Sequence, residues 1–256
     1  MPERLRKPVA AIYHFARAAD DIADEGDLTG EERLHRLDDF RNELNHIAAG
    51  EMPLLPLFRN LAIEIKLYQL PLQPFHDLLD AFSQDVVKKR YASYDELLDY
   101  CRRSANPVGS LLLHLYDEST PVTLACSDAI CTALQLINFW QDVAKDYAIG
   151  RIYLPQDDLA EYGVSETQIA RGSIDEAWRK LMGFQADRAR ALMLQGAPLG
   201  TILSGRIGLE MRMIMQGGLR ILDKLQAAGY DMFRNRPELR PFDWVIMLAK
   251  SAPLRF

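Results

Sequence analysis

Three polar residues at four-residue intervals mark the segment whose chemistry is clearest. Asn138, Asp142 and Asp146 lie on one face if residues 129–148 form an α-helix, because side chains four positions apart project from the same side. Two carboxylates and an amide offer oxygen ligands, which suit a hard cation such as Mg²⁺. Bulky apolar residues surround the three, so the face is expected to be partly buried. A metal would offset the cost of burying these carboxylates.

A second acidic face lies far upstream. Asp20, Asp24 and Asp27 fall at helical positions i, i+4 and i+7, beside an apolar stripe. A solvated helix face is the alternative interpretation, but crowded like charges destabilise an isolated helix by about 0.2–0.5 kcal/mol per pair. We therefore expect the two acidic faces to meet across a cavity and to hold Mg²⁺, with more than one ion.

Cationic and phenolic side chains flank both acidic faces. Arg17 precedes the first face, and Lys145, Arg151 and Tyr153 adjoin the second. Each alone would be an ordinary surface residue, but together they have the arrangement of a phosphate clamp. A cavity with metal-binding carboxylates at one end and apolar helices below suits an allylic diphosphate. The metal would make diphosphate a better leaving group, and a carbocation needs dry, aromatic surroundings.

The bulk properties exclude several other classes of function. The chain has 256 residues, of which 48% are hydrophobic and 26% charged, with a net charge of −6 and no basic block, which argues against nucleic-acid binding. The three cysteines lack metal-ligand spacing and favour a reducing compartment. The N-terminus lacks the apolar region of a signal peptide, and no window reaches the roughly 18 apolar residues of a membrane span. We expect a cytoplasmic protein that is at most peripheral to the inner membrane.

Apolar residues recur with helical spacing throughout the chain, and no alternating run predicts a sheet. We therefore predict an all-α fold, a single-domain helical bundle over residues 1–256 with a central cavity. The predicted helices begin near Pro8, at Thr29 (to Ala49), at Leu57 (to Leu70), near Pro74, at Ser93 with Glu96 in a capping box, at Pro121 (to about Ala148), at Ser173 (to about Gln195), at Ala197 (to Ala228) and at Phe242 (to Lys250). We expect a kink at Pro107 and Gly109, and an extended segment over residues 150–155.

Three motifs in this order resemble those of the squalene/phytoene synthases, a family of all-α, head-to-head isoprenoid synthases. The first, R-x-x-D-D-x-x-D, matches residues 17–24, and the second, Y-C-x-x-x-A-x-x-V-G, matches residues 100–109. The third, N-x-x-x-D-x-x-x-D followed by G-R-x-Y-x-P, matches residues 138–155. The family usually has some twenty or more residues before the Pro8 region, so we expect either that the start of this sequence is truncated or misassigned, or that the site is less well covered.

The resemblance implies a role for each matching residue. The implied Mg²⁺ ligands are Asp20, Asp24, Asn138, Asp142 and Asp146. The implied diphosphate-binding residues are Arg17, Asn138 and Arg151. Tyr100 and Tyr153 would face the reacting carbons, and Tyr230 would be a further site residue.

Subfamily segments, among them YCRRSANPVG and NFWQDV, resemble the bacterial hydroxysqualene synthases of hopanoid biosynthesis. The implied reaction is the Mg²⁺-dependent conversion of presqualene diphosphate to hydroxysqualene, which needs no NADPH. The alternatives are presqualene diphosphate synthesis, another condensation of two prenyl diphosphates such as the phytoene type, and a non-catalytic isoprenoid-binding relative. The expected partners are the prenyl diphosphate, other enzymes of the pathway and a membrane surface, because the product is a hydrophobic C30 molecule.

Overall fold

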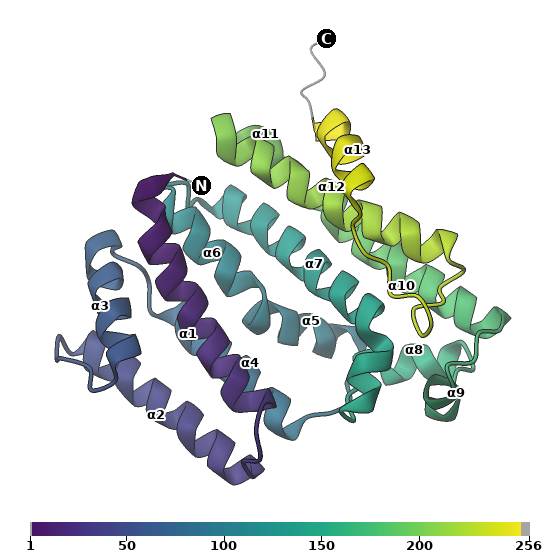
Figure 1. Cartoon of the computed structure of the whole chain (residues 1–256), viewed down its shortest axis with the longest axis horizontal. Helices are drawn as coiled ribbons and strands as arrows, with labels where there is room; N and C mark the ends of the chain where they lie inside the picture. Colours follow the sequence, from purple (N-terminus) through teal and green to yellow (C-terminus); the bar gives the residue numbers. More distant parts are fainter. Residues whose placement is uncertain (1, 252–256) are drawn as a thin grey trace. The chain divides into compact units, whose positions relative to one another are not determined.

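The computed structural model describes residues 2–251, and nearly all of its regular structure is helical (Figure 1). The elements are η1 (Glu3–Leu5), α1 (Arg6–Asp24), α2 (Gly30–Ala48), α3 (Pro56–Tyr68), α4 (Gln73–Val87), α5 (Tyr94–Ser104), α6 (Asn106–Leu115), α7 (Pro121–Ala148), α8 (Gln156–Glu161), α9 (Glu166–Arg171), α10 (Glu176–Gln195), α11 (Leu199–Ile202), α12 (Gly205–Ala227) and α13 (Pro241–Ser251). Within residues 2–251, β pairing is limited to one isolated parallel bridge between Arg90 and Ile152. The all-α prediction is confirmed.

The chain divides into two compact units. One comprises Met1–Lys88 and Arg102–Leu124, and the other comprises Lys89–Cys101 and Ala125–Phe256. We call them the first and the second unit. The single domain expected over residues 1–256 stays a prediction.

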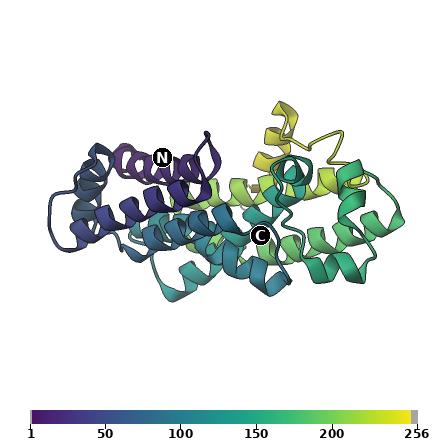
Figure 2. The same ribbon diagram turned by 90° about the horizontal axis from the view of Figure 1, so that it is seen from below.

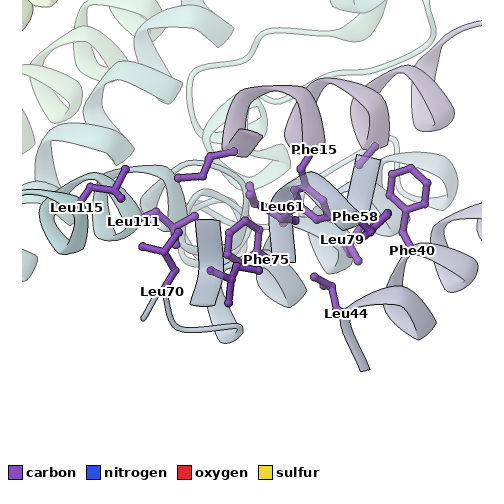
Figure 3. Packing of buried hydrophobic residues seen from close by; sticks show 14 of the residues in the cluster. Phe15, Phe40, Leu44, Phe58, Leu61, Leu70, Phe75, Leu79, Leu111 and Leu115 are labelled. Atoms are coloured by element: carbon purple, nitrogen blue, oxygen red, sulfur yellow. The ribbon is translucent and has the colours of Figure 1, made fainter. Parts of the chain in front are cut away.

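Four phenylalanines form the centre of the first unit. Phe15 of α1 meets Phe58 of α3 and Phe75 of α4 edge to face, with ring centroids 5.7 and 5.2 Å apart, and Phe40 of α2 meets Phe58 at 4.9 Å (Figure 3). Edge-to-face contacts are a preferred geometry of aromatic rings. Because one ring comes from each of four helices, this cluster fixes α1, and with it the first acidic face, against its neighbours.

The first acidic face is shorter than predicted. α1 ends at Asp24, where Glu25 adopts an extended conformation, and Asp27 lies in the loop that follows. The prediction that Asp27 shares the face of Asp20 and Asp24 is wrong. The sequence reason is the next helix, which begins with a capping box in which Thr29 accepts from the Glu32 amide and Glu32 accepts from the Thr29 amide.

In the second unit, α7, α10 and α12 surround a core that includes the fully buried Trp140 and Trp178. Gly218 of α12 permits close packing, because a Cβ at this position would lie 2.7 Å from Met193 Cε of α10 and 3.2 Å from Ile137 Cδ1 of α7. Figure 2, seen from below, shows α10 and α12 side by side, as in Figure 1. The close approach holds α7 in register with α10 and α12.

Two helix boundaries of the second unit differ from prediction. The helix predicted to begin at Ser173 begins at Glu176, because Asp175 is the N-cap and its side chain accepts from the Trp178 amide at 2.9 Å. The helix predicted over 197–228 is interrupted between α11 and α12. A regular helix cannot continue there, because Gly205 has a φ of +63° and the backbone turns so tightly that a Cβ on Gly208 would lie 2.0 Å from the Leu203 carbonyl oxygen.

The kink expected at Pro107 is a full break between α5 and α6, at Ala105. α7, by contrast, runs over the predicted range without interruption. The expectation that no window is apolar enough for a membrane span is wrong by composition, because α7, alone among the described helices, is long and apolar enough to cross a membrane. Half of its most apolar window is, however, buried inside the protein. This is how a central core helix behaves.

We predict that Phe15→Ala destabilises the first unit strongly. The fully buried ring contacts three other rings, so its loss leaves a cavity, and the free energy of unfolding should fall by about 3–5 kcal/mol. Urea denaturation followed by circular dichroism measures the change. Tyr13→Ala is the matched control on the same helix, because Tyr13 is 63% exposed. Equal losses in the two variants would contradict the central role of Phe15.

Candidate active site

The later turns of α1 carry Arg17 together with the predicted metal ligands Asp20 and Asp24. Nη1 of Arg17 is 3.2 Å from Asp20 Oδ2. Nη2 is 2.7 Å from Asp21 Oδ1 and 2.6 Å from Glu25 Oε1. These carboxylates, Asp21 foremost, raise the pKa of Arg17 above its ordinary value. Arg17, which we expect to bind diphosphate, therefore also balances the acidic charge of its own helix.

The end of α1 is held by Arg33 of α2, which the sequence analysis did not single out. Its Nη1 donates to the Ile22 carbonyl at 2.7 Å, and its Nη2 donates to the Gly26 carbonyl at 2.7 Å. A guanidinium in this place satisfies carbonyl groups at the helix end and complements the negative end of the helix dipole. Arg33 thus positions the turn that carries Asp20 and Asp24.

The second predicted metal-binding face lies on α7, in the second unit. Asn138 is exposed, whereas Asp142 and Asp146 are half-buried. Arg236 binds Asp142 through both oxygens, with Nε 2.6 Å from Oδ1 and Nη2 2.9 Å from Oδ2, and Lys145 Nζ lies 3.1 Å from Oδ1. Burial alone would raise the pKa of Asp142, but the hydrogen bonds from Arg236 and Lys145 outweigh it and hold the pKa below its ordinary value. The carboxylate is therefore ionised at neutral pH.

Arg236 was not among the predicted site residues, since it lies 94 positions from Asp142 and no local spacing links the two. Its place is fixed by the next residue, because the buried Gln141 side chain donates from Nε2 to the Pro237 carbonyl at 2.6 Å. The loop before α13 is thereby attached beside the acidic face of α7.

The chain turns immediately after α7, where the sequence predicts an extended segment over residues 150–155. Gly150 has a φ of +81°, and the Arg151 amide donates to the Asp146 carbonyl at 2.8 Å. The Ile152 amide then donates to the Lys89 carbonyl at 3.0 Å. Arg151, predicted to bind diphosphate, is buried as a result, with 7% of its surface exposed.

Tyr100 and Tyr153, the tyrosines predicted to face the reacting carbons, belong to one buried aromatic cluster with Tyr91 and Phe139. Tyr153 stacks on Phe139 with ring centroids 3.7 Å apart and planes 10° from parallel. Tyr91 and Tyr100 lie 5.6 and 5.9 Å from Tyr153. Rings from α5, α7 and the segments before and after them thus converge, although their positions in the sequence are far apart.

A cavity of about 10 Å³ lies where this aromatic cluster meets charged groups. Phe139 and Tyr153 line one part of it, and Asp146 and Arg151 line another. Its volume is that of about one water molecule. The second unit therefore brings a predicted metal ligand, a predicted diphosphate-binding residue and a predicted catalytic tyrosine to a single place.

Tyr230, the third predicted catalytic tyrosine, has a different environment. Its carbonyl accepts from Trp178 Nε1 at 3.0 Å, and its ring lies against Gly183 of α10. Burial and the nearby Asp187 raise the pKa of the phenol. No ring contact between described residues joins Tyr230 to the aromatic cluster, so its proposed role at the site depends on the resemblance alone.

A family model described as squalene/phytoene synthase matches residues 1–243. The chain belongs to this family. A hydroxysqualene synthase of Rhodopseudomonas palustris is 38% identical over 247 residues, covering 95% of this chain and 82% of that protein. A phytoene synthase of Arthrospira platensis is 32% identical over 249 residues, covering 92% and 80%. The crystal structure of the squalene synthase HpnC of Alicyclobacillus acidocaldarius superposes with a TM-score of 0.84 at 35% identity, covering 90% and 86%.

Membership of the squalene/phytoene synthase family confirms the resemblance and makes an isoprenoid synthase the coarse function. The predicted donors on α7 fit a Mg²⁺ ion chemically, because Asn138, Asp142 and Asp146 offer oxygen atoms on one helical face. Within residues 2–251, no three acidic, histidine or cysteine side chains are gathered as a complete metal site. The acidic residues of α1 belong to the other unit, so the meeting of the two faces stays a prediction.

The ion pair at Asp142 leads to a prediction about metal binding. Because Arg236 binds both oxygens of Asp142, a cation at this carboxylate competes with the guanidinium for the same negative charge. Arg236→Met should lower the free energy of unfolding of the metal-free protein by about 1–3 kcal/mol, since a half-buried carboxylate loses its main partner. Added Mg²⁺ should restore part of this loss and should shift the melting temperature more than it does in the wild type.

Arg234→Met is the matched control, because Arg234 is exposed and pairs with Asp231 rather than with Asp142. Thermal melts of the three proteins with and without Mg²⁺ give the comparison. A Mg²⁺-induced shift of equal size in all three would show that Arg236 and the cation do not compete for Asp142.

Proposed function

We propose that this chain converts presqualene diphosphate to hydroxysqualene, with Mg²⁺ as cofactor. The observation that carries the proposal is its similarity to the Rhodopseudomonas palustris hydroxysqualene synthase, at 38% identity over 95% of the chain. The geometry of the second unit supports this reaction class, because a carboxylate, a guanidinium and aromatic rings are gathered around one water-sized cavity. The polar groups of this cluster would contact the diphosphate, and its aromatic groups would contact the carbocation.

The first chemical step is loss of diphosphate. The C–O bond breaks and its electron pair leaves with the diphosphate, so negative charge accumulates on the departing oxygens. Arg17 and Arg151 would bind those oxygens, and a guanidinium suits this role because its paired donors match phosphate geometry. Asp20, Asp24, Asn138, Asp142 and Asp146 would hold Mg²⁺. The bound metal would neutralise the diphosphate and make it a better leaving group.

The second step is rearrangement of the cyclopropylcarbinyl cation that remains. Aromatic faces stabilise a cation through their quadrupole, and the effect is larger where water is excluded. Tyr100, Tyr153, Tyr91 and Phe139 present such buried faces. Tyr100 and Tyr153 would face the reacting carbons, and Tyr230 would contribute from its position against α10.

Capture by water completes the reaction. The water oxygen forms the new C–O bond and its proton passes to solvent or to the released diphosphate, so the product is an alcohol and no electrons are needed from outside. NADPH has no role in this scheme. The product belongs to squalene and hopanoid biosynthesis, and we propose that the protein acts in the cytoplasm, with peripheral contact to the inner membrane and to enzymes of the same pathway.

The main alternative is a condensation on the same scaffold. The relative from Arthrospira platensis, a phytoene synthase, favours keeping this alternative. In that case the substrates would be two prenyl diphosphates, and the first product from farnesyl diphosphate would be presqualene diphosphate. A non-catalytic isoprenoid-binding protein is a further alternative, but each acidic residue of the two motifs is present.

The deciding experiment is incubation with Mg²⁺ and either presqualene diphosphate or farnesyl diphosphate, followed by extraction and mass spectrometry. We expect hydroxysqualene from presqualene diphosphate and no product from farnesyl diphosphate. Presqualene diphosphate formed from farnesyl diphosphate would reassign the chain to the condensation. Binding without turnover of either substrate would favour the non-catalytic alternative.

Asp146→Asn should lower turnover of presqualene diphosphate by at least about 100-fold, because it removes a charged oxygen ligand from the metal-binding face. Asp128→Asn is the matched control on the same helix. Asp128 lies outside the motif of Asn138, Asp142 and Asp146, so its neutralisation should change activity little. An Asp146→Asn enzyme with wild-type turnover and unchanged Mg²⁺ dependence would remove this residue from the metal site.

A further inference from the structure

The last described helix, α13, exposes an unusual set of apolar side chains. Phe242 is 71% exposed, Trp244 55%, Val245 63% and Leu248 56%. We call these four residues the α13 face. Large apolar residues scattered singly over a surface need no explanation, but four within seven positions form a patch that favours removal from water.

The orientation of α13 is fixed from its other side. Asp243 is buried and pairs with Arg220 Nε at 2.7 Å and with Lys224 Nζ, both on α12. At the far end of the helix, Arg212 Nε donates to the Ser251 carbonyl at 2.8 Å. Figure 1 shows α13 lying beside α12. Because both ends are anchored, Phe242, Val245 and Leu248 stay on the outer side of the helix. Trp244 lies at the edge of the face, where it also lines an apolar cavity with Ile137 of α7 and Ile214 of α12.

Cationic side chains stand at both ends of the α13 face. Arg240 and Lys250, both exposed, lie at the two ends of the helix, and between residues 240 and 251 the only acidic residue is Asp243, which points inward. In the loop before the helix, Arg234 is paired with Asp231, and the exposed Glu238 lies 3.6 Å from Arg236. The cationic rim therefore consists of Arg240 and Lys250, in a chain whose net charge is −6.

We propose that α13 docks this protein on an anionic lipid surface, with the α13 face inserted at the boundary between headgroups and acyl chains. Tryptophan and phenylalanine beside arginine and lysine are typical of helices that lie in a membrane interface. The cationic rim favours negatively charged headgroups over a neutral surface. Docking on lipid would let the enzyme deliver a hydrophobic C30 product to the membrane. This purpose, but not the docking itself, rests on the proposed function.

The tryptophans provide a direct test on the full chain. Trp140 and Trp178 are fully buried, so collisional quenching reports Trp244. With vesicles of phosphatidylglycerol and phosphatidylcholine in equal parts, the protein should sediment with the lipid, and brominated acyl chains should quench its emission. With phosphatidylcholine alone, the bound fraction should fall at least about tenfold. Absence of sedimentation with the anionic vesicles, or sedimentation without quenching, would overturn the proposal.

Paired variants separate the apolar and the charged contributions. Phe242→Ser with Val245→Ser should weaken vesicle binding at least about tenfold, and Arg240→Glu with Lys250→Glu should abolish the preference for anionic lipid. The control is Ile63→Ser with Leu67→Ser on α3, where both residues are also more than 60% exposed. This control should bind like the wild type. Equal binding by all variants would show that another surface is responsible.

Two further outcomes are decisive. If sedimentation velocity shows a dimer that Phe242→Ser with Val245→Ser dissociates, a second copy of the chain covers the α13 face and the lipid proposal is wrong. Turnover of detergent-solubilised presqualene diphosphate should be unchanged in the α13 variants. Loss of vesicle binding with unchanged turnover in the α13 variants would therefore support the docking surface. Absence of turnover in the wild type would contradict the proposed function and leave the docking proposal unaffected.

Discussion

The reversal of the chain after α7 is the constraint on which the site in the second unit depends. Gly150 adopts a left-handed φ of +81°, which residues with a Cβ rarely accept, and the Arg151 amide closes the turn on the Asp146 carbonyl. The following residues can then pair with the segment before α5, which carries Tyr91 toward Tyr153. A straight continuation of α7 would carry Arg151 away from Asp146 and leave the aromatic cluster without its central ring.

Two partly or fully buried carboxylates of the second unit are paired with cationic side chains of the same unit. Asp142 has a bidentate partner in Arg236, and Asp243 has partners on α12. A half-buried carboxylate is costly unless it is paired, so these arginines allow acidic groups to stand beside an apolar core. The arrangement also sets a condition for metal binding at Asp142. A cation at Asp142 must stabilise the carboxylate more than the Arg236 guanidinium does. A divalent ion that binds together with a negatively charged substrate meets this condition best.

Local patterns in the sequence predicted much of the fold. The four-residue spacing and the apolar periodicity gave the bounds of α7, and the Ser93–Glu96 pattern gave the start of α5, where the Glu96 amide donates to Ser93 Oγ. The errors have local causes as well. Thr29 starts a new helix too soon for Asp27 to remain in α1, and Asp175 rather than Ser173 caps α10. Arg236 acts 94 positions from Asp142, a distance at which periodicity carries no information. Arg33 reaches Ile22 and Gly26 across the turn between α1 and α2, where the helical periodicity is broken.

The family motifs succeed for a physical reason. In α7, Phe139 lies seven positions before Asp146, so the two side chains share one side of the helix and line the same cavity, where Phe139 stacks on Tyr153. Asn138 and Asp142 lie on the adjoining strip of the helix surface. A single helix can therefore present oxygen ligands and an aromatic wall side by side, and a rigid helix holds the two in fixed register. In the proposed reaction, ionisation would need the oxygen ligands and survival of the carbocation would need the aromatic wall, so neither set can shift along the chain without displacing the other.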